Sequence, residues 1–177
     1  MDLINIFKAY DIRGIYPTEI DEKKVKRIAM AYAGLLKQNR QLSAISNQPL
    51  VIAVGRDVRL SGPKLQQAVI DGLTEAGVNV IDIGAVPTEM LYFAVGFYYY
   101  DGGIQVSASH NPKEFNGLKM VRGGVEAISS DSGLREIRQL AESAADFSAP
   151  VRGSTERKEA EGDYFDYLTR FVHFDAI

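Results

Sequence analysis

One short stretch, residues 107–112, concentrates side chains that could do chemistry. It reads Ser-Ala-Ser-His-Asn-Pro and so combines two hydroxyls, an imidazole and an amide with a proline that favours a turn. A serine hydroxyl can act as a nucleophile or carry a transferred group, and small neighbours let the backbone come close to a ligand. The stretch is either a functional loop or a structural turn, and its composition leaves both open.

The adjacent Ser109 and His110 could suggest a serine hydrolase. On an extended backbone, neighbouring side chains point in opposite directions, so we expect this pair to be poorly placed for proton transfer. No Gly-x-Ser-x-Gly sequence surrounds the serine, and the one other histidine is His173, in a predicted terminal helix. These observations argue against a hydrolase.

Two further polar segments contain arginines that could bind an anion. Arg13 lies beside Gly14 in the segment 10–14, and Arg56 lies beside Gly55 in the segment 55–59. A guanidinium offers a fork of donors that suits phosphate. Each arginine could equally form an ordinary surface ion pair with a neighbouring aspartate.

Lys119 is the remaining candidate for chemistry. It alternates with Leu118 and Met120 on a predicted strand, so its side chain should face the opposite way from theirs. Lys119 is either a solvated surface lysine or, near a phosphate or a sugar hydroxyl, an acid or base.

Composition argues against several other functions. The sequence contains no Gly-x-x-x-x-Gly-Lys-Ser/Thr loop and no Gly-x-Gly-x-x-Gly motif, so neither an ATPase nor a dinucleotide fold is supported. It has no cysteine and two histidines, which excludes thiolate chemistry and leaves little room for a histidine metal site. A net charge of −3 gives no reason to expect nucleic acid or an anionic membrane as partner. No long apolar run or signal peptide is evident, so we expect a soluble, cytoplasmic protein.

Strands alternate with helices along the chain. Apolar periodicity predicts helices over residues 21–37, 61–76, 88–99 and 130–144, and strands over residues 50–54, 78–83, 103–106 and 118–121. This order predicts an α/β fold, with a mixed, largely parallel four-stranded sheet covered by helices on both faces. Ligands in such folds bind beyond the carboxyl ends of strands, where the polar loops fall. Ser61 or its neighbour is expected to cap the second helix.

The length of 177 residues fits about one domain. Residues 145–161 are small and polar and are predicted to form a linker. Apolar side chains beyond them recur at helical spacing and predict a terminal helix. We therefore assign residues 1–150 to the domain and residues 151–177 to a linker and helix.

Taken together, the motifs resemble one enzyme family. Residues 7–14, 55–62, 86–88, 107–112 and 116–119 resemble, in order and spacing, the signature blocks of α-D-phosphohexomutases of the phosphomannomutase/phosphoglucomutase type. The resemblance covers essentially the whole chain and points to the family's first domain. The departures are Ser107 where threonine is commoner, Val58 where glycine is common and Glu89 in place of a second proline.

The resemblance implies that Ser109 is the phosphoryl carrier. In this family the serine before the histidine donates a phosphoryl group to a hexose 1- or 6-phosphate. The bound hexose 1,6-bisphosphate then reorients and returns its other phosphate to the serine. A phosphoserine carries about −1.5 to −2 charges near neutral pH, so such a site needs cations.

The same resemblance assigns roles to neighbouring residues. Lys119 and Arg13 are expected to transfer protons and position the sugar, and Tyr10 to line the same cleft. His110, counted with the catalytic residues, and Asn111, counted with the substrate-binding residues, are expected to shape the serine loop.

The family also implies a metal ion and further domains. Mg²⁺ would be held by the phosphate of Ser109 and by an aspartate-rich loop of a second domain, and no Asp-Gly-Asp-Gly-Asp run occurs in this sequence. Residues 151–177 would then lead toward that domain. The expected partners are a hexose phosphate and the remaining domains, and the chain alone is expected to be inactive.

Two alternatives stay open. The chain could be a stand-alone sugar-phosphate-binding module without catalysis, or an interaction protein that uses the aromatic-rich helix at residues 90–100. The version of the motif at residues 10–14 favours mannose or glucose phosphates over glucosamine phosphate, by resemblance only.

Overall fold

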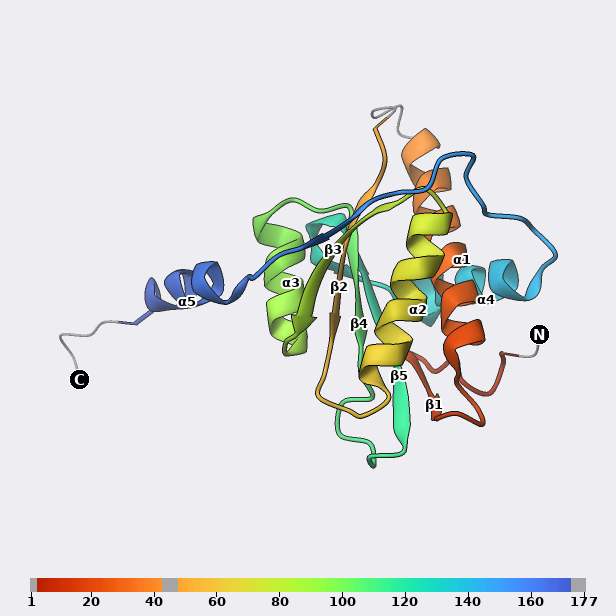
Figure 1. Ribbon diagram of the computed structural model, residues 1–177, viewed down its shortest axis with the longest axis horizontal. Coiled ribbons are helices and arrows are strands. Elements are labelled where there is room, and N and C mark those ends of the chain that lie inside the picture. The colour runs from red at the N-terminus through yellow and green to blue at the C-terminus, as the bar shows by residue number, and fades with distance from the viewer. Residues whose placement is uncertain (1–2, 43–47, 173–177) are drawn as a thin grey trace.

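A mixed seven-stranded sheet forms the centre of the molecule in the computed structural model, which describes residues 3–42 and 48–172 (Figure 1). The strand order across the sheet is β1-β5-β4-β2-β3-β7, and β6 pairs with β5. The strands are β1 (Ile12–Ile15), β2 (Val51–Arg56), β3 (Asn79–Ala85), β4 (Gly102–Val106), β5 (Phe115–Arg122), β6 (Glu126–Ala127) and β7 (Thr155–Arg157).

The direction of the strands determines where the polar loops meet. β2 pairs in parallel with β3 and β4, β3 pairs in parallel with β7, and β5 is antiparallel to β1, β4 and β6. The carboxyl ends of β2 and β4 therefore lie at the same edge as the beginning of β5. The loops 57–61 and 107–114 leave the sheet at that edge and lie close together.

Helices cover both faces of the sheet (Figure 1). α1 (Glu22–Leu42), α2 (Gly62–Glu75) and α4 (Arg135–Glu142) pack on one face, and α3 (Thr88–Phe97) packs on the other. Each layer has its own cluster of buried apolar side chains. α5 (Glu161–Thr169) extends beyond α3 and contacts it through aromatic rings, among them Phe93 and Tyr164 with their centroids 5.3 Å apart.

A close contact between α1 and β4 requires a glycine. Tyr32 is fully buried and donates its hydroxyl hydrogen bond to the Val121 carbonyl at 2.8 Å. A Cβ atom on Gly102 would lie 2.1 Å from that hydroxyl oxygen. Burial raises the pKa of Tyr32, so the phenol stays neutral and acts as a donor.

The predicted fold class is confirmed, but the predicted number of four strands is wrong. Three additional strands are too short for their periodicity to stand out: β1 lies in the segment read as a polar loop, and β6 has two residues. β7 lies within residues 145–161, which we predicted to be a linker, and its three residues are all exposed. Its backbone nevertheless pairs with β3.

The bounds of two helices also differ from the expectation. α4 begins at Arg135 rather than at residue 130, because the backbone at Ser132 and Gly133 is not helical. α1 continues to Leu42 rather than ending at residue 37, because polar residues on an exposed helix face do not interrupt a helix. The terminal helix is present as α5, whereas His173 lies outside the described residues. None of the helices within residues 3–42 and 48–172 is long and apolar enough to cross a membrane.

Candidate active site

A buried carboxylate joins two of the predicted site residues. Asp11 directly precedes β1, and the pairing of Ile12 with Leu118 brings it alongside Lys119 on β5. Its side chain is 4% exposed and accepts hydrogen bonds from Arg13 Nη2 at 2.6 Å, Arg13 Nε at 2.9 Å and Lys119 Nζ at 2.9 Å. One carboxylate therefore fixes both cationic groups. Arg13 and Asp11 therefore do not form the ordinary surface ion pair that was the alternative, because the carboxylate is buried.

The predicted serine loop follows β4 and presents Ser109 to solvent. Ser109 has a φ angle of 54°, in the left-handed region that residues other than glycine rarely adopt. Its backbone N–H donates to Ser107 Oγ at 2.9 Å. Its own Oγ lies 3.4 Å from Nδ1 of His110. The expectation that these two side chains point apart was wrong, because it assumed an extended backbone at Ser109.

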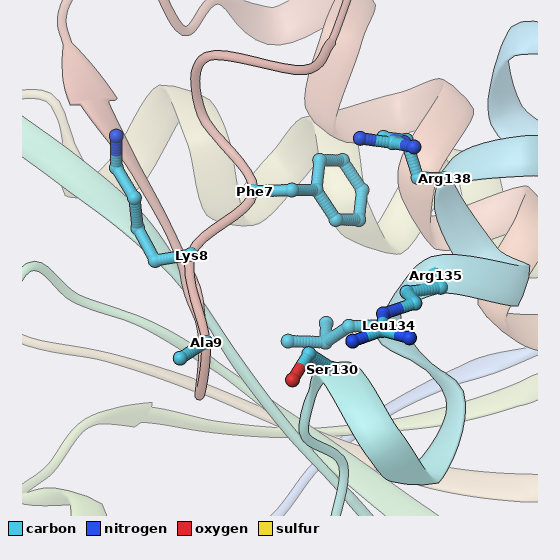
Figure 2. Close-up of a pocket in the computed structure, with 7 residues that line it drawn as sticks. All are labelled: Phe7, Lys8, Ala9, Ser130, Leu134, Arg135 and Arg138. Atoms are coloured by element: carbon cyan, nitrogen blue, oxygen red, sulfur yellow. The ribbon is translucent and has the colours of Figure 1, made fainter.

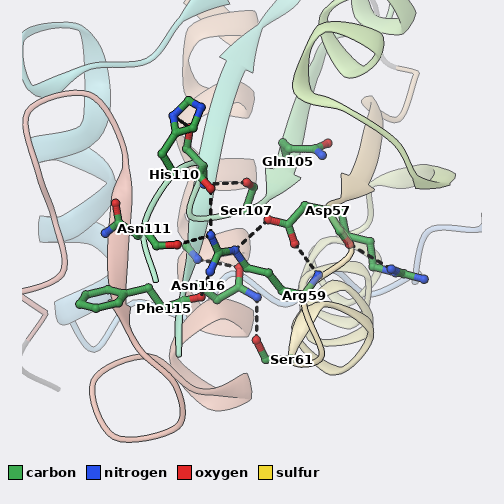
Figure 3. A network of polar contacts seen from close by, with 12 residues as sticks. Asp57, Arg59, Ser61, Gln105, Ser107, His110, Asn111, Phe115 and Asn116 are labelled. Atoms are coloured by element: carbon green, nitrogen blue, oxygen red, sulfur yellow. Dashed lines mark hydrogen bonds and ion pairs between the residues drawn. The ribbon is translucent and has the colours of Figure 1, made fainter. Parts of the chain in front are cut away.

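Arg59 holds the serine loop by its main chain (Figure 3). Its guanidinium donates to four main-chain carbonyls of the loop, at distances from 2.6 to 3.0 Å, those of Ser109, Asn111, Pro112 and Phe115. Its Nε donates to Asp57 Oδ2 at 3.1 Å. All five N–H groups of the guanidinium are thus used, four of them by a segment about fifty residues away in the sequence.

A second contact fastens the end of the loop to α2. Asn116 is fully buried, and its Nδ2 donates to Ser61 Oγ at 2.8 Å, while its Oδ1 accepts the N–H of Gly117 at 2.8 Å (Figure 3). Ser61 occupies the N-cap position of α2 but makes no side-chain cap hydrogen bond. Ser61 therefore does not cap the helix with its side chain, because its hydroxyl accepts from Asn116 instead.

Asn111 connects the serine loop to the cation pair. Its Oδ1 accepts a hydrogen bond from Arg13 Nη1 at 2.9 Å, and its carbonyl oxygen accepts one from Arg59. Asn111 and Arg13 border a cleft of about 490 Å³, whose lining also includes Tyr10. Tyr10 is mostly exposed at the cleft. Ser109, His110 and Lys119 are not among the residues that line it.

A family model described as phosphoglucomutase/phosphomannomutase, alpha/beta/alpha domain I, matches residues 5–146. The chain belongs to this family. The phosphomannomutase of Vibrio cholerae is 42% identical over 172 residues, which cover 97% of this chain and 36% of the relative. A phosphomannomutase of Klebsiella pneumoniae is 45% identical over 142 residues, covering 80% of this chain and 83% of the relative.

The fold is likewise that of the phosphoglucomutase/phosphomannomutase family. A crystal structure of a family protein from Burkholderia thailandensis matches with a TM-score of 0.84 and 32% sequence identity, over 97% of this chain and 37% of that one. A putative phosphomannomutase from Thermus thermophilus matches with a TM-score of 0.80 and 26% identity, over 96% of this chain and 36% of that one. The resemblance read from the motifs is confirmed. The chain spans about 36% of the length of the Vibrio cholerae relative.

Sequence reasoning missed two residues of the candidate site, Asp11 and Arg59. Both lie in quoted motifs, but neither received a role. A signal was present, because Asp-x-Arg occurs twice, at residues 11–13 and 57–59, and each aspartate accepts from the arginine two positions later. The two arginines then contact the same loop.

A second cavity, of about 250 Å³, lies between residues 7–9 and residues 130–138 of this family domain (Figure 2). Arg135 and Arg138 of α4 line it, but each lies within ion-pair distance of a carboxylate, at 3.1 Å from Asp131 and 3.8 Å from Glu142 respectively. These arginines therefore do not make the cavity a strong anion site. Within residues 3–42 and 48–172 there is also no group of three or more histidine, aspartate or glutamate side chains that could hold a metal ion.

Proposed function

We propose that this chain is the phosphoserine-bearing first domain of a cytoplasmic phosphohexomutase that interconverts mannose or glucose 1- and 6-phosphates. The observation that carries the proposal is the position of Ser109. Its hydroxyl is exposed on a loop that Arg59 holds by four carbonyls, and the loop is linked through Asn111 to the Arg13–Asp11–Lys119 cluster. A nucleophile on a held loop that is linked to fixed cations suits phosphoryl transfer, which depends mainly on positioning and charge neutralisation.

In the proposed reaction, a hydroxyl oxygen of the bound hexose phosphate attacks the phosphorus of phosphorylated Ser109. The Oγ–P bond breaks, the hydroxyl loses its proton, Ser109 Oγ gains one and a hexose 1,6-bisphosphate forms. After the bisphosphate reorients, Ser109 Oγ loses its proton and attacks the phosphorus of the other phosphate. The bond from that phosphorus to the sugar oxygen breaks, and the sugar oxygen gains a proton. Lys119 and Arg13 are the proposed proton-transfer and positioning groups, and His110 lies close enough to Ser109 Oγ to shape its surroundings.

The residues of this chain fit Mg²⁺ only in part. A phosphate on the exposed Ser109 would supply oxygen ligands, and the remaining ligands would come from outside the described residues. The ion would neutralise charge on the phosphoryl group. The chain's own residues supply the loop geometry and the two cations. We therefore propose that the chain needs the remaining domains of a longer protein for turnover.

Phosphopeptide mapping tests the carrier role directly. The chain would be incubated with glucose 1,6-bisphosphate or mannose 1,6-bisphosphate and digested, comparing wild type with Ser109→Ala and with Ser107→Ala as the matched control. We expect phosphate on Ser109 in wild type and in Ser107→Ala, and none in Ser109→Ala. If a longer protein containing this domain also carries no phosphate on Ser109 but binds hexose phosphate, the mutase proposal is wrong and the binding module is favoured.

A further inference from the structure

We propose that Arg59 is a positioning residue that holds Ser109 in its left-handed conformation and so aims the hydroxyl for phosphoryl transfer. The functional part of this inference rests on the proposed function, whereas the conformational part rests on geometry alone. Arg59 itself is 12% exposed at its side chain and lies beneath the loop, so it supports Ser109 without replacing the cations of the cleft.

The contacts of Arg59 converge on the turn that contains Ser109. The guanidinium lies 2.8 Å from the Ser109 oxygen and 2.7 Å from the Asn111 oxygen through Nη2, and its Nη1 reaches two further carbonyls at the end of the loop. Four carbonyls can approach one centre only if the chain curls around it. A left-handed residue at the apex produces such a curl.

The conformation of Ser109 has an energetic cost that these contacts offset. A non-glycine residue at positive φ is strained and persists only where its surroundings enforce it. Hydrogen bonds from a charged donor are stronger than neutral ones and favour the curled loop. The same contacts point the negative ends of four carbonyl dipoles at the Arg59 guanidinium. Because that charge offsets them, these oxygens do not repel a phosphate on the serine.

Asp57 keeps the guanidinium in one orientation. Its carboxylate accepts from Arg59 Nε at 3.1 Å and from the Arg59 backbone N–H at 3.0 Å, which holds the side chain at both ends. A lysine at position 59 would offer three donors from a single point and could not span the four carbonyls. The planar fork of arginine is therefore required here.

Arg27 provides a matched control far from the loop. Its guanidinium also donates to four main-chain carbonyls at distances from 2.8 to 3.3 Å, those of Leu140, Ala141, Ser143 and Ala145. Removing either arginine deletes the same kind of contact. If Arg59→Ala and Arg27→Ala both destabilise the fold, a change at Ser109 in Arg59→Ala alone shows that Arg59 positions Ser109 and does not merely stabilise the domain.

The first experiment measures the conformation of Ser109 by NMR on the chain itself. The intraresidue HN–Hα nuclear Overhauser effect is strong for a residue at positive φ. We expect it to be strong in wild type and in Arg27→Ala, weak in Arg59→Ala, and partly restored in Arg59→Ala by added methylguanidinium. A strong effect that persists in Arg59→Ala, or one lost equally in Arg27→Ala, would overturn the proposal.

The second experiment measures labelling of Ser109 from a ³²P-labelled hexose 1,6-bisphosphate. We expect Arg59→Ala to lower the maximal rate about 100-fold, the effect of a misplaced reactive group, with an unchanged half-saturating concentration. Arg27→Ala should label like wild type. Equal maximal rates in Arg59→Ala and wild type would refute the positioning role. If the wild type stays unlabelled in a longer protein containing this domain as well, the proposed function is contradicted, and the NMR experiment would still decide the conformational role of Arg59.

Discussion

Substitution of Asp11 by asparagine tests whether one carboxylate holds the two cations of the site. The change keeps the shape of the side chain but removes its charge. Arg13 and Lys119 would then face a neutral amide, whose nitrogen can only donate. The amide oxygen could still accept from both cations, as Asp11 Oδ2 does now, but it would offer only a partial charge in place of the full charge of the carboxylate.

The structure sets the size of the effect. Removing one partner of a fully buried ion pair costs about 3–5 kcal/mol. Here the Asp11 side chain is 4% exposed, but those of Arg13 and Lys119 are 29% and 21% exposed, so water partly replaces the lost carboxylate. We expect a loss of about 2 kcal/mol, close to that of one hydrogen bond to a charged group. For a domain of this size that lowers Tm by about 4–8 °C.

Thermal unfolding followed by circular dichroism measures this loss, and Asp131→Asn is the matched control. Asp131 also pairs with an arginine, at 3.1 Å, but both side chains are more than two-thirds exposed. Such a surface pair contributes about 0–1 kcal/mol. If Asp11→Asn lowered Tm no more than Asp131→Asn, the carboxylate would not be what holds Arg13 and Lys119, and the reasoning would fail.

Two further predictions concern the fold around the site. Gly102→Ala should destabilise the domain by about 1–3 kcal/mol in urea denaturation, because the new methyl overlaps the Tyr32 hydroxyl, and Tyr32→Phe in the same chain should recover part of the loss. The hydrogen bond from the Tyr16 hydroxyl lowers the pKa of Glu22 in the folded state. The ionised Glu22 therefore stabilises the fold at pH values above the pKa that it has in the unfolded chain. This contribution disappears as the pH falls through the pKa of Glu22 in the folded state. Tyr16→Phe should raise the Glu22 pKa in a ¹³C NMR titration; an unchanged value would contradict this assignment.

The elements with strong patterns could be predicted from the sequence. Buried strands such as β2 and amphipathic helices such as α2 have enough residues for their periodicity to be distinguished from neighbouring loops. β7 could not be predicted, because its three exposed residues join the sheet only through backbone hydrogen bonds to β3. Those bonds depend on the path of the chain after α4, which side-chain pattern does not specify.

The candidate site was predictable as a set of motifs but not as an arrangement. The motifs identified Ser109, Arg13 and Lys119 by resemblance. They did not indicate that Asp11 would accept from both cations, because that contact depends on the pairing of β1 with β5. Nor did they indicate the left-handed Ser109, whose conformation depends on Arg59, fifty residues earlier in the chain.

The two Asp-x-Arg segments explain why such separated motifs belong to one site. In each, the aspartate accepts from the arginine two residues later and so fixes its guanidinium. Arg59 then uses its remaining donors on the main chain of the serine loop, whereas Arg13 reaches the Asn111 side chain of the same loop and stays open to the cleft. The segment 57–59 thus supports the loop through its main chain. The segment 11–13 connects the loop to the charged surface that a substrate would meet. A change in either segment should therefore alter the position of Ser109 relative to the cleft, although neither segment contacts its hydroxyl.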